Sequence, residues 1–303
     1  MAEKTTIQDF TTVTEGKATI LFPKDEVFYN PAQQFNRDLS VAVIRTWSES
    51  LAATKKQLRK ANWDQKKKRR KEAAQQENTA EEPTETLSPT NETKQPNGSN
   101  LPRRKITILE ALSATGLRAI RYALEIPHVS TVLANDMSPD AISSIHRNIS
   151  HNTLPPGLVT ATCSDANSLM YSRHSNRVDV VDLDPCGTAA PFIDSAIQAI
   201  AGDGLLCVTC TDMSVLAGIG YPEKCYANYG GSPVKQEYTH EVALRLVLNS
   251  IASTAAKYGR AIVPLLSLSI DFYVRLFIRV VQSPAQVKFL ARYGSFGKGE
   301  LMQ

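Results

Sequence analysis

Short apolar segments alternate with helical patterns from residue 106 to residue 281, and this alternation constrains the fold more than any other feature. The segments predicted as strands are residues 106–109, 129–134, 158–163, 178–183 and 204–211. The segments predicted as helices are residues 117–124, 140–152, 191–200 and 237–258. Strands that alternate with helices favour an α/β fold with a parallel, doubly wound sheet.

The last two predicted strands, residues 260–269 and 272–281, differ from the others because no helix separates them. Only Ile270 and Asp271 lie between them, so the two strands must be antiparallel. We therefore expect a parallel sheet that ends in an antiparallel pair.

The N-terminal part of the chain predicts a small hairpin followed by a helix. Residues 11–22 alternate across Glu15-Gly16 as a hairpin does, and residues 34–60 have a helical pattern. In that helix Phe35, Leu39, Val43 and Trp47 recur at helical spacing and predict a buried apolar stripe.

Residues 52–104 differ in composition from the rest of the chain and predict a disordered insertion. A basic run at residues 66–71 precedes a tract at residues 77–100 that is rich in Glu, Thr, Pro and Asn and poor in large apolar residues. Such a tract buries too little surface to offset its ordering entropy. The basic run is consistent with a nuclear-import signal, a nucleic-acid contact or a solvated helix end.

This composition change predicts four regions. They are residues 1–51 before the insertion, residues 52–104, which form the insertion, residues 105–285, which form the α/β core, and residues 286–303 after that core.

Composition excludes several classes of protein. Hydrophobic residues make up 42% of the chain, which supports a substantial core, and no apolar run has the length of a membrane span. The pattern of the N-terminal residues predicts neither a secretory signal nor a mitochondrial presequence. The five cysteines are scattered, which suits a reducing compartment. Cys207 and Cys210 lie in a predicted strand, where side chains three apart point to opposite faces, so we predict no metal site.

An acidic residue lies at or just after each of four consecutive predicted strands. These residues are Glu110, Asp136, Asp165 and Asp184. Ligands of open α/β sheets bind outside the carboxyl ends of the strands, so the four acids predict a polar crevice along one edge. The loop at residues 111–116 lacks the GxGxxG pattern, which argues against a nicotinamide dinucleotide.

The same acids fit the parts of S-adenosylmethionine. Asp136 is placed to accept the ribose hydroxyls, and Asp165 to accept from the adenine amino group, with the small Ala166 beside it leaving room for the ring. An arginine is needed for the methionine carboxylate, and Arg37 and Arg118 are the candidates, although each is equally typical of a structural or surface arginine. Asp184 then remains for the methyl acceptor. Pro185 turns the chain out of the sheet directly after it, although a plain strand-to-turn exit has the same pattern.

Ordered motifs along the chain resemble those of the tRNA (guanine-26) dimethyltransferase family. They are Phe28-Tyr29-Asn30-Pro31, Asn36-Arg37-Asp38-Leu39-Ser40, Ala114-Thr115-Gly116-Leu117-Arg118, Asn135-Asp136, Asp182-Leu183-Asp184-Pro185-Cys186-Gly187, Thr211-Asp212-Met213 and Ser269-Ile270-Asp271-Phe272-Tyr273-Val274-Arg275. The resemblance implies a class I (Rossmann-like) methyltransferase sheet. It also implies transfer of one or two methyl groups from S-adenosylmethionine to the 2-amino group of guanine 26 in tRNA.

The resemblance also implies roles for individual residues. Arg37, Arg118, Asp136, Asp165 and Ala166 would contact the cofactor. Asp184 would be the catalytic acid, and Phe28 and Pro185 would contact the guanine. The partner would be tRNA, with no membrane and no obligatory protein partner, and the basic run implies the nucleus, with the cytoplasm and the mitochondrion as further compartments.

Two features depart from the family pattern. Cys186 stands where the family usually has an aromatic residue, and the chain ends at Gln303, where similar proteins continue into a domain that grips tRNA. The alternatives are therefore an amino-methyltransferase for another RNA, DNA or protein, or a chain that binds cofactor without turnover.

Overall fold

The computed structural model describes residues 10–23, 29–51, 63–65 and 105–296, except the side chains of residues 291–296. It divides into two compact units, Met1–Arg45 with Lys105–Gln303, and Thr46–Arg104. In the second unit residues 46–51 and 63–65 are helical. The basic run at residues 66–71 and the whole acidic tract after it lie outside the described residues, so the predicted insertion stays a prediction.

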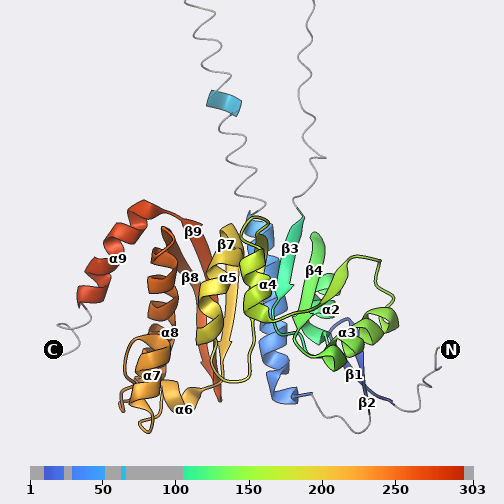
Figure 1. Cartoon of the computed structure of the whole chain (residues 1–303), viewed down its shortest axis with the longest axis horizontal. Coiled ribbons are helices and arrows are strands. Elements are labelled where there is room, and N and C mark those ends of the chain that lie inside the picture. Colours follow the sequence, from blue (N-terminus) through green and yellow to red (C-terminus); the bar gives the residue numbers. More distant parts are fainter. Residues whose placement is uncertain (1–9, 24–28, 52–62, 66–104, 297–303) are drawn as a thin grey trace, which may run out of the picture. The chain divides into compact units, whose positions relative to one another are not determined.

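The first unit contains a seven-stranded sheet with the order β5-β4-β3-β6-β7-β9-β8 (Figure 1). Its strands are β3 (Ile106–Glu110), β4 (Val129–Asp136), β5 (Val159–Cys163), β6 (Val178–Leu183), β7 (Ile200–Cys210), β8 (Arg260–Ile270) and β9 (Tyr273–Gln282). Strands β3 to β7 pair in parallel, whereas β9 pairs antiparallel with both β7 and β8. The predicted parallel sheet with a C-terminal antiparallel pair is confirmed.

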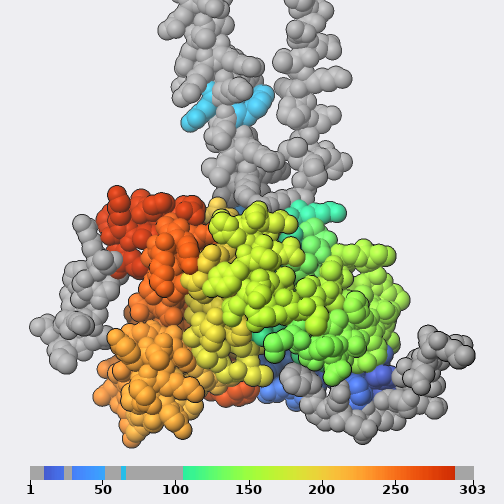
Figure 2. Space-filling model, viewed as in Figure 1, coloured from blue at the N-terminus to red at the C-terminus, as the bar shows by residue number. Residues whose placement is uncertain are grey.

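Helices cover both faces of this sheet. One face carries α4 (Ala166–Ser172), α5 (Ile193–Ala199) and α8 (Thr239–Ala256), which form the near side in Figures 1 and 2. The other face carries α2 (Leu117–Glu125), α3 (Pro139–His151) and the helix at residues 34–45. Short 3₁₀ helices, η2 (Pro31–Gln33) and η3 (Ala190–Phe192), precede two of these helices, and α9 (Pro284–Phe296) follows β9.

The two faces of the sheet differ in chemistry. Towards α4, α5 and α8 the strands present apolar side chains such as Leu109, Leu183 and Leu206, which belong to the main core cluster. Because alternate residues of a strand face opposite ways, the neighbours Glu110 and Asp182 face α2 instead. A polar layer therefore lies between the sheet and α2.

The predicted hairpin is present as β1 (Phe10–Glu15) and β2 (Ala18–Pro23). Ile20 and Phe22 pack with Leu117 and Ile120 of α2. Asn148 of α3 binds the backbone of β2, because its Oδ1 accepts a hydrogen bond from the Leu21 amide at 2.9 Å. The hairpin is thus fixed against the two helices that follow β3 and β4.

The prediction of a buried apolar stripe on the helix at residue 34 is wrong for Phe35, whereas Leu39 and Val43 are half-buried and Trp47 is buried. Phe35 is 56% exposed, and the buried face consists of Asn36, Arg37, Ser40, Val41 and Ile44. Periodicity identifies the most apolar face, but this helix packs on the polar layer and therefore buries its polar residues.

Two short helices lie between β7 and α8. These are α6 (Met213–Leu216) and α7 (Pro222–Tyr229), and Val215, Leu216, Cys225 and Tyr229 bury their side chains in the core. Among the helices that the structure describes, none has the length and hydropathy of a membrane span.

Candidate active site

The carboxyl edge of the sheet brings the predicted acids to one side of the molecule. Glu110 and Asp136 are the last residues of β3 and β4, Asp184 directly follows β6, and Asp165 lies just beyond the end of β5. The parallel pairing of these strands explains this, because it places all their carboxyl ends at one edge.

The loop between β3 and α2 wraps around Asp136. The Ala114 amide donates to Asp136 Oδ2 at 2.9 Å, and the Ser138 amide donates to Oδ1 at 3.0 Å. Gly116, with φ of 77°, turns the chain into α2, and a side chain there would approach Ile145 to 3.1 Å. A close approach of backbone and helix therefore requires glycine at this position.

Asp165 and Ala166 begin α4. Asp165 is exposed and caps the helix, accepting the Ser168 amide at 2.8 Å. The hydrogen bond from the Ser168 backbone is the main reason that the pKa of Asp165 lies below its usual value. Ala166 is buried.

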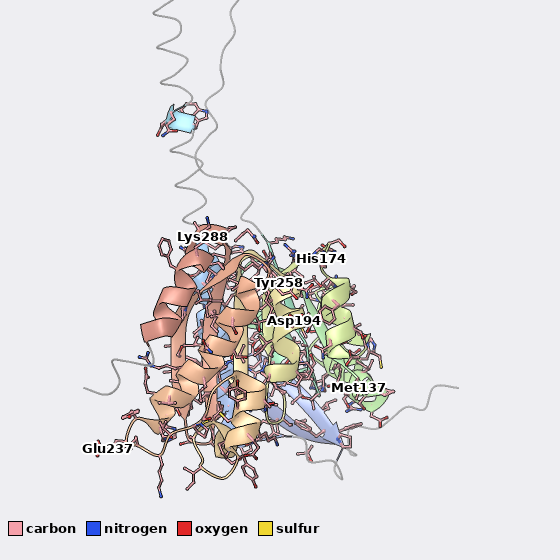
Figure 3. All side chains as sticks on the ribbon, turned by 60° about the vertical axis from the view of Figure 1, so that its left-hand side comes forward. Met137, His174, Asp194, Glu237, Tyr258 and Lys288 are labelled. Carbon is pink, nitrogen blue, oxygen red and sulfur yellow. The ribbon has the colours of Figure 1, made fainter. Side chains whose placement is uncertain are left out.

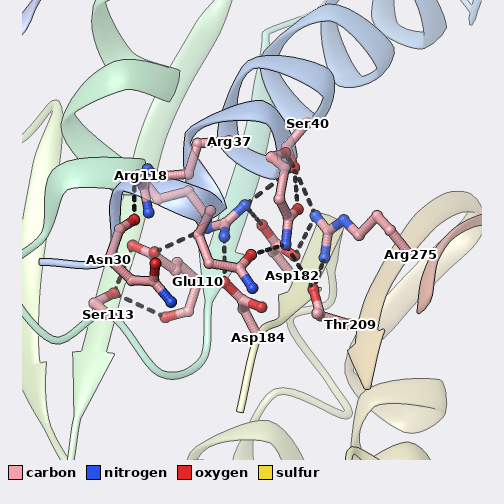
Figure 4. A network of polar contacts seen from close by, with 12 residues as sticks. Asn30, Arg37, Ser40, Glu110, Ser113, Arg118, Asp182, Asp184, Thr209 and Arg275 are labelled. Atoms are coloured by element: carbon pink, nitrogen blue, oxygen red, sulfur yellow. Dashed lines mark hydrogen bonds and ion pairs between the residues drawn. The ribbon is translucent and has the colours of Figure 1, made fainter. Parts of the chain in front are cut away.

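Arg118 is the centre of the polar layer (Figure 4). It is 4% exposed, it donates to Asp184 Oδ2, and its Nη1 donates to Ser40 Oγ at 3.0 Å. Its Nε lies 3.7 Å from Glu110 Oε1. Its guanidinium thus joins β3, the turn after β6 and the helix at residue 34.

Asp184 is an ionised carboxylate in this environment. Burial opposes its ionisation, but the charges of Arg118 and Arg275 and a hydrogen bond from Thr209 outweigh that effect and lower its pKa. Asp184 is therefore charged at neutral pH, and its oxygens can accept hydrogen bonds.

The turn after Asp184 is held against β7. Pro185 is buried and Cys186 is exposed. The Gly187 amide donates to Thr211 Oγ1 at 2.7 Å, and the Thr211 amide donates to the Gly187 carbonyl at 2.8 Å. This pair of contacts fixes the turn on which the acid is mounted.

A second arginine and a second buried aspartate complete the layer. Arg275 is fully buried and donates to Asp182 Oδ1, to Ser40 Oγ and to Thr209 Oγ1, each at 2.8 Å. Tyr122 donates to the other oxygen of Asp182. The residue pattern gave no role to these side chains, yet a charged residue within each apolar strand, Asp182 in β6 and Arg275 in β9, signals a buried partner.

Glu110 carries the surplus charge of this layer. Burial is the main cause that raises its pKa to about 8, against the opposing attraction of Arg118. Three acids, Glu110, Asp182 and Asp184, face two arginines, and a proton on Glu110 balances them.

Comparison with known proteins identifies the family. The model of the "N2,N2-dimethylguanosine tRNA methyltransferase" family matches residues 4–296. The chain belongs to this family. It is 52% identical over 295 residues to the mitochondrial tRNA (guanine(26)-N(2))-dimethyltransferase of Saccharomyces cerevisiae, covering 95% of this chain and 50% of that protein.

Other members of the family agree. The tRNA (guanine(26)-N(2))-dimethyltransferase of Homo sapiens is 45% identical over 284 residues, covering 92% of this chain and 43% of that protein. The structure of Trm1 from Pyrococcus horikoshii with S-adenosyl-L-methionine superposes with a TM-score of 0.69 at 29% identity, covering 92% of this chain and 63% of that chain. The chain spans about half the length of the curated relatives it matches. The family resemblance and the methyltransferase sheet are both confirmed.

Not all the residues that the family resemblance implies meet in one place. Arg118 and Asp184 are in contact, and Asp136 holds the loop before α2. Arg37 instead forms a bidentate pair with Glu15 of the hairpin, at 2.7 and 2.5 Å, and donates to the Asn30 carbonyl at 3.0 Å. Phe28 lies outside the described residues.

The cysteine pair in β7 has no metal-site geometry. Cys207 and Cys210 are both buried free thiols, and burial raises the pKa of Cys210 to about 12. In the described ranges no group of three or more His, Cys, Asp and Glu residues has the arrangement of a metal site.

Proposed function

We propose that this chain is the catalytic part of a tRNA (guanine-26) N2-dimethyltransferase. It transfers one or two methyl groups from S-adenosylmethionine to the exocyclic 2-amino group of guanine 26. The observation that carries this proposal is Asp184, an ionised carboxylate on a fixed turn at the carboxyl end of β6, in a chain of this family.

The residues at the sheet edge fit S-adenosylmethionine chemically. The ligand bears positive charge at its sulfonium and amino groups, and the edge has more carboxylates than arginines. Asp136 retains acceptor capacity for ribose hydroxyls beside its two amide donors. Exposed Asp165 and the small, buried Ala166 serve the adenine.

The two arginines proposed for the methionine carboxylate are both already engaged. Arg37 is paired with Glu15, and Arg118 is shared between Asp184 and Ser40. Arg118 therefore couples cofactor binding to the catalytic acid. A methionine carboxylate bound to its guanidinium would compete with Asp184 for the same N–H donors.

The chemistry requires a proton acceptor at the guanine amine. The 2-amino lone pair is delocalised into the purine ring, and S-adenosylmethionine supplies an electrophilic methyl group when bound. Asp184 accepts a hydrogen bond from the amine, which orients the nitrogen, and takes the proton that the nitrogen loses. Guanine 26 must leave its stack to reach this carboxylate, and Phe28 and Pro185 are the residues proposed to hold it.

Methyl transfer from labelled S-adenosylmethionine to unmodified tRNA tests this function. Label is expected in unmodified tRNA and not in a tRNA in which adenine replaces guanine 26. Asp184→Asn should lower the rate about 10²- to 10⁴-fold, as removal of a general base does, and leave cofactor affinity in place. Equal label in both tRNAs would point to another acceptor, and cofactor binding without any label would favour a binding chain without turnover.

Calorimetry tests the cofactor residues separately. Asp136→Ala should weaken S-adenosylmethionine binding about tenfold or more, since it removes charge-assisted hydrogen bonds. Asp140→Ala, which removes a carboxylate from the exposed first turn of α3, is the matched control. Equal affinities of Asp136→Ala and the unsubstituted chain would remove Asp136 from the site.

The place of action is proposed more coarsely. The yeast relative is named as mitochondrial, whereas the basic run at residues 66–71 of this chain has the composition of a nuclear-import signal. We propose a compartment that contains tRNA, the nucleus or the mitochondrion. Fluorescent tagging with and without the basic run distinguishes them.

A further inference from the structure

A pocket of about 320 Å³ lies at the edge of the sheet opposite Asp184. It is lined by His174, Arg177, Gln198, Tyr258, Arg260 and Gln282. These residues surround the starts of β6, β7 and β8 and the end of β9. Figure 3 shows His174 and Tyr258 at this end of the molecule and Met137, next to Asp136, towards the other. The length of β6 separates the two sites by roughly 20 Å.

The side chains that line the pocket are hydrogen-bond donors and lack acidic groups. Every lining side chain carries a hydrogen-bond donor, two of the six are arginines, and none is a carboxylate. A pocket with this lining suits an anion.

Arg260 is the strongest sign that an anion belongs here. Only 2% of it is exposed, and Nη1 donates to the carbonyls of Ile197 and Ile200 at 2.5 and 2.8 Å. Its Nη2 is buried and has no partner among the described residues, where Arg260 also forms no ion pair. Burial, and then the nearby charge of Arg177, lower its pKa. A buried charge without a counterion is unfavourable, so the fold carries a cost that an anion would relieve.

Asp194, which accepts hydrogen bonds from the lining residues Gln198 and Tyr258, does not supply that counterion. Asp194 accepts from Tyr171, Tyr258 and Gln198, each at 2.9 Å. These donors and the charge of Lys257 satisfy Asp194, although burial opposes its ionisation. Arg177 uses only Nε, which donates to the Gln198 carbonyl at 3.1 Å. Its terminal nitrogens have no partner among the described residues and are exposed to an incoming ligand.

We propose that this pocket binds a phosphate group, with Arg260 as its charged floor and Arg177 as its exposed clamp. Two arginines match the charge of a phosphate, and a guanidinium fork matches its oxygens. The volume exceeds that of the phosphate group itself, so part of an attached ester fits as well. The group belongs to a nucleic-acid backbone or to a free phosphate compound.

Isothermal titration of the full 303-residue chain with inorganic phosphate, against chloride at constant ionic strength, tests the proposal. Arg177→Gln should weaken phosphate binding about tenfold, as loss of a charge-assisted hydrogen bond does. Arg260→Met should abolish it. Arg245→Gln, which removes an exposed arginine of α8 outside the pocket, should leave affinity unchanged.

Two results would overturn the proposal. One is the absence of any phosphate binding beyond that of chloride. The other is unchanged phosphate affinity in Arg177→Gln. Because Arg177 is exposed, this variant keeps the fold and decides the question even where Arg260→Met does not fold.

A second titration with tRNA distinguishes the sources of the phosphate. A fall in tRNA affinity of Arg177→Gln, together with competition between tRNA and inorganic phosphate, assigns the pocket to the nucleic-acid backbone. Unchanged tRNA affinity together with weakened phosphate binding assigns it to a free phosphate compound. Neither result depends on methyl transfer, so the pocket and the proposed activity stand or fall separately.

Discussion

The two edges of the sheet carry opposite excess charges. At the carboxyl edge, the three acids Glu110, Asp182 and Asp184 face only Arg118 and Arg275, and the raised pKa of Glu110 indicates that a proton balances them. At the amino edge, Arg260 is buried with two carbonyls and, among the residues described, no carboxylate as partner. One edge has an excess of acid and the other an excess of base.

The contrast is clearest between two arginines on neighbouring strands. Arg275 of β9 and Arg260 of β8 are both buried, yet Arg275 has an aspartate and two hydroxyls as partners. Burial alone therefore does not say what an arginine does in a sheet. Arg275 has a carboxylate as partner and stabilises the structure, whereas Arg260, which has no carboxylate partner among the described residues, is the arginine proposed to bind an anion.

The largest expected effect is on the pH dependence of stability and concerns Glu110. Glu110 has a pKa of about 8 in the folded chain against an ordinary value of 4.5. The stability that this protonated group contributes is fully present below pH 4.5 and is lost as the pH rises through 8. The free energy of unfolding of Glu110→Gln, relative to the unsubstituted chain, should therefore rise with pH. The slope should reach at most about 1.4 kcal/mol per pH unit.

Urea denaturation of both chains at several pH values between about 5 and 8 measures how the difference in free energy of unfolding changes with pH. Glu241→Gln, on the surface of α8, controls for the loss of a carboxylate. A difference between Glu110→Gln and the unsubstituted chain that does not vary with pH would mean that the acid excess is balanced in another way.

The next effect compares the two arginines directly. Arg275→Met leaves Asp182 buried without its main partner and should lower the free energy of unfolding by about 3–5 kcal/mol. Arg260→Met leaves two carbonyls without their donor but also removes a buried charge that has no counterion. The loss in free energy of unfolding should therefore be clearly smaller than for Arg275→Met. Chemical denaturation of both variants measures the difference, and equal losses would break the comparison.

A smaller effect concerns the tyrosines of the polar layer. Tyr122 donates to buried Asp182, so Tyr122→Phe should cost about 1.5–3 kcal/mol. Tyr273 is equally buried, but its hydroxyl has no partner in the described part of the chain. Tyr273→Phe should therefore be neutral or slightly stabilising in thermal unfolding. A larger loss in Tyr273→Phe than in Tyr122→Phe would contradict the assignment.

The smallest expected effect is the loss of a solvent-exposed ion pair. Arg245 and Glu241 form an i,i+4 pair at 2.8 Å on α8, with 72% and 54% of their side chains exposed. Arg245→Gln should cost only about 0.3–0.5 kcal/mol, and this loss should shrink in high salt. A loss that persists in high salt would show that exposure does not separate this pair from the buried ones.

Local sequence patterns are sufficient to predict the alternation of strands and helices and the edge of the sheet where the acids lie. Hydrophobic periodicity is local, and parallel strands place their carboxyl ends together whatever their order. Glu110, Asp136 and Asp184 could therefore be assigned to one edge of the sheet from their positions in the chain alone. Their roles in binding and catalysis remain proposals.

The pairing of the buried charges, in contrast, depends on the packing of distant segments. Asp182 and Arg275 lie 93 residues apart and meet because β6, β7 and β9 are neighbours in the sheet. The same packing turned the polar face of the helix at residue 34 inward and left Phe35 outside. Local patterns carry no information on which strands become neighbours, and the partner of a buried charge depends on that neighbour.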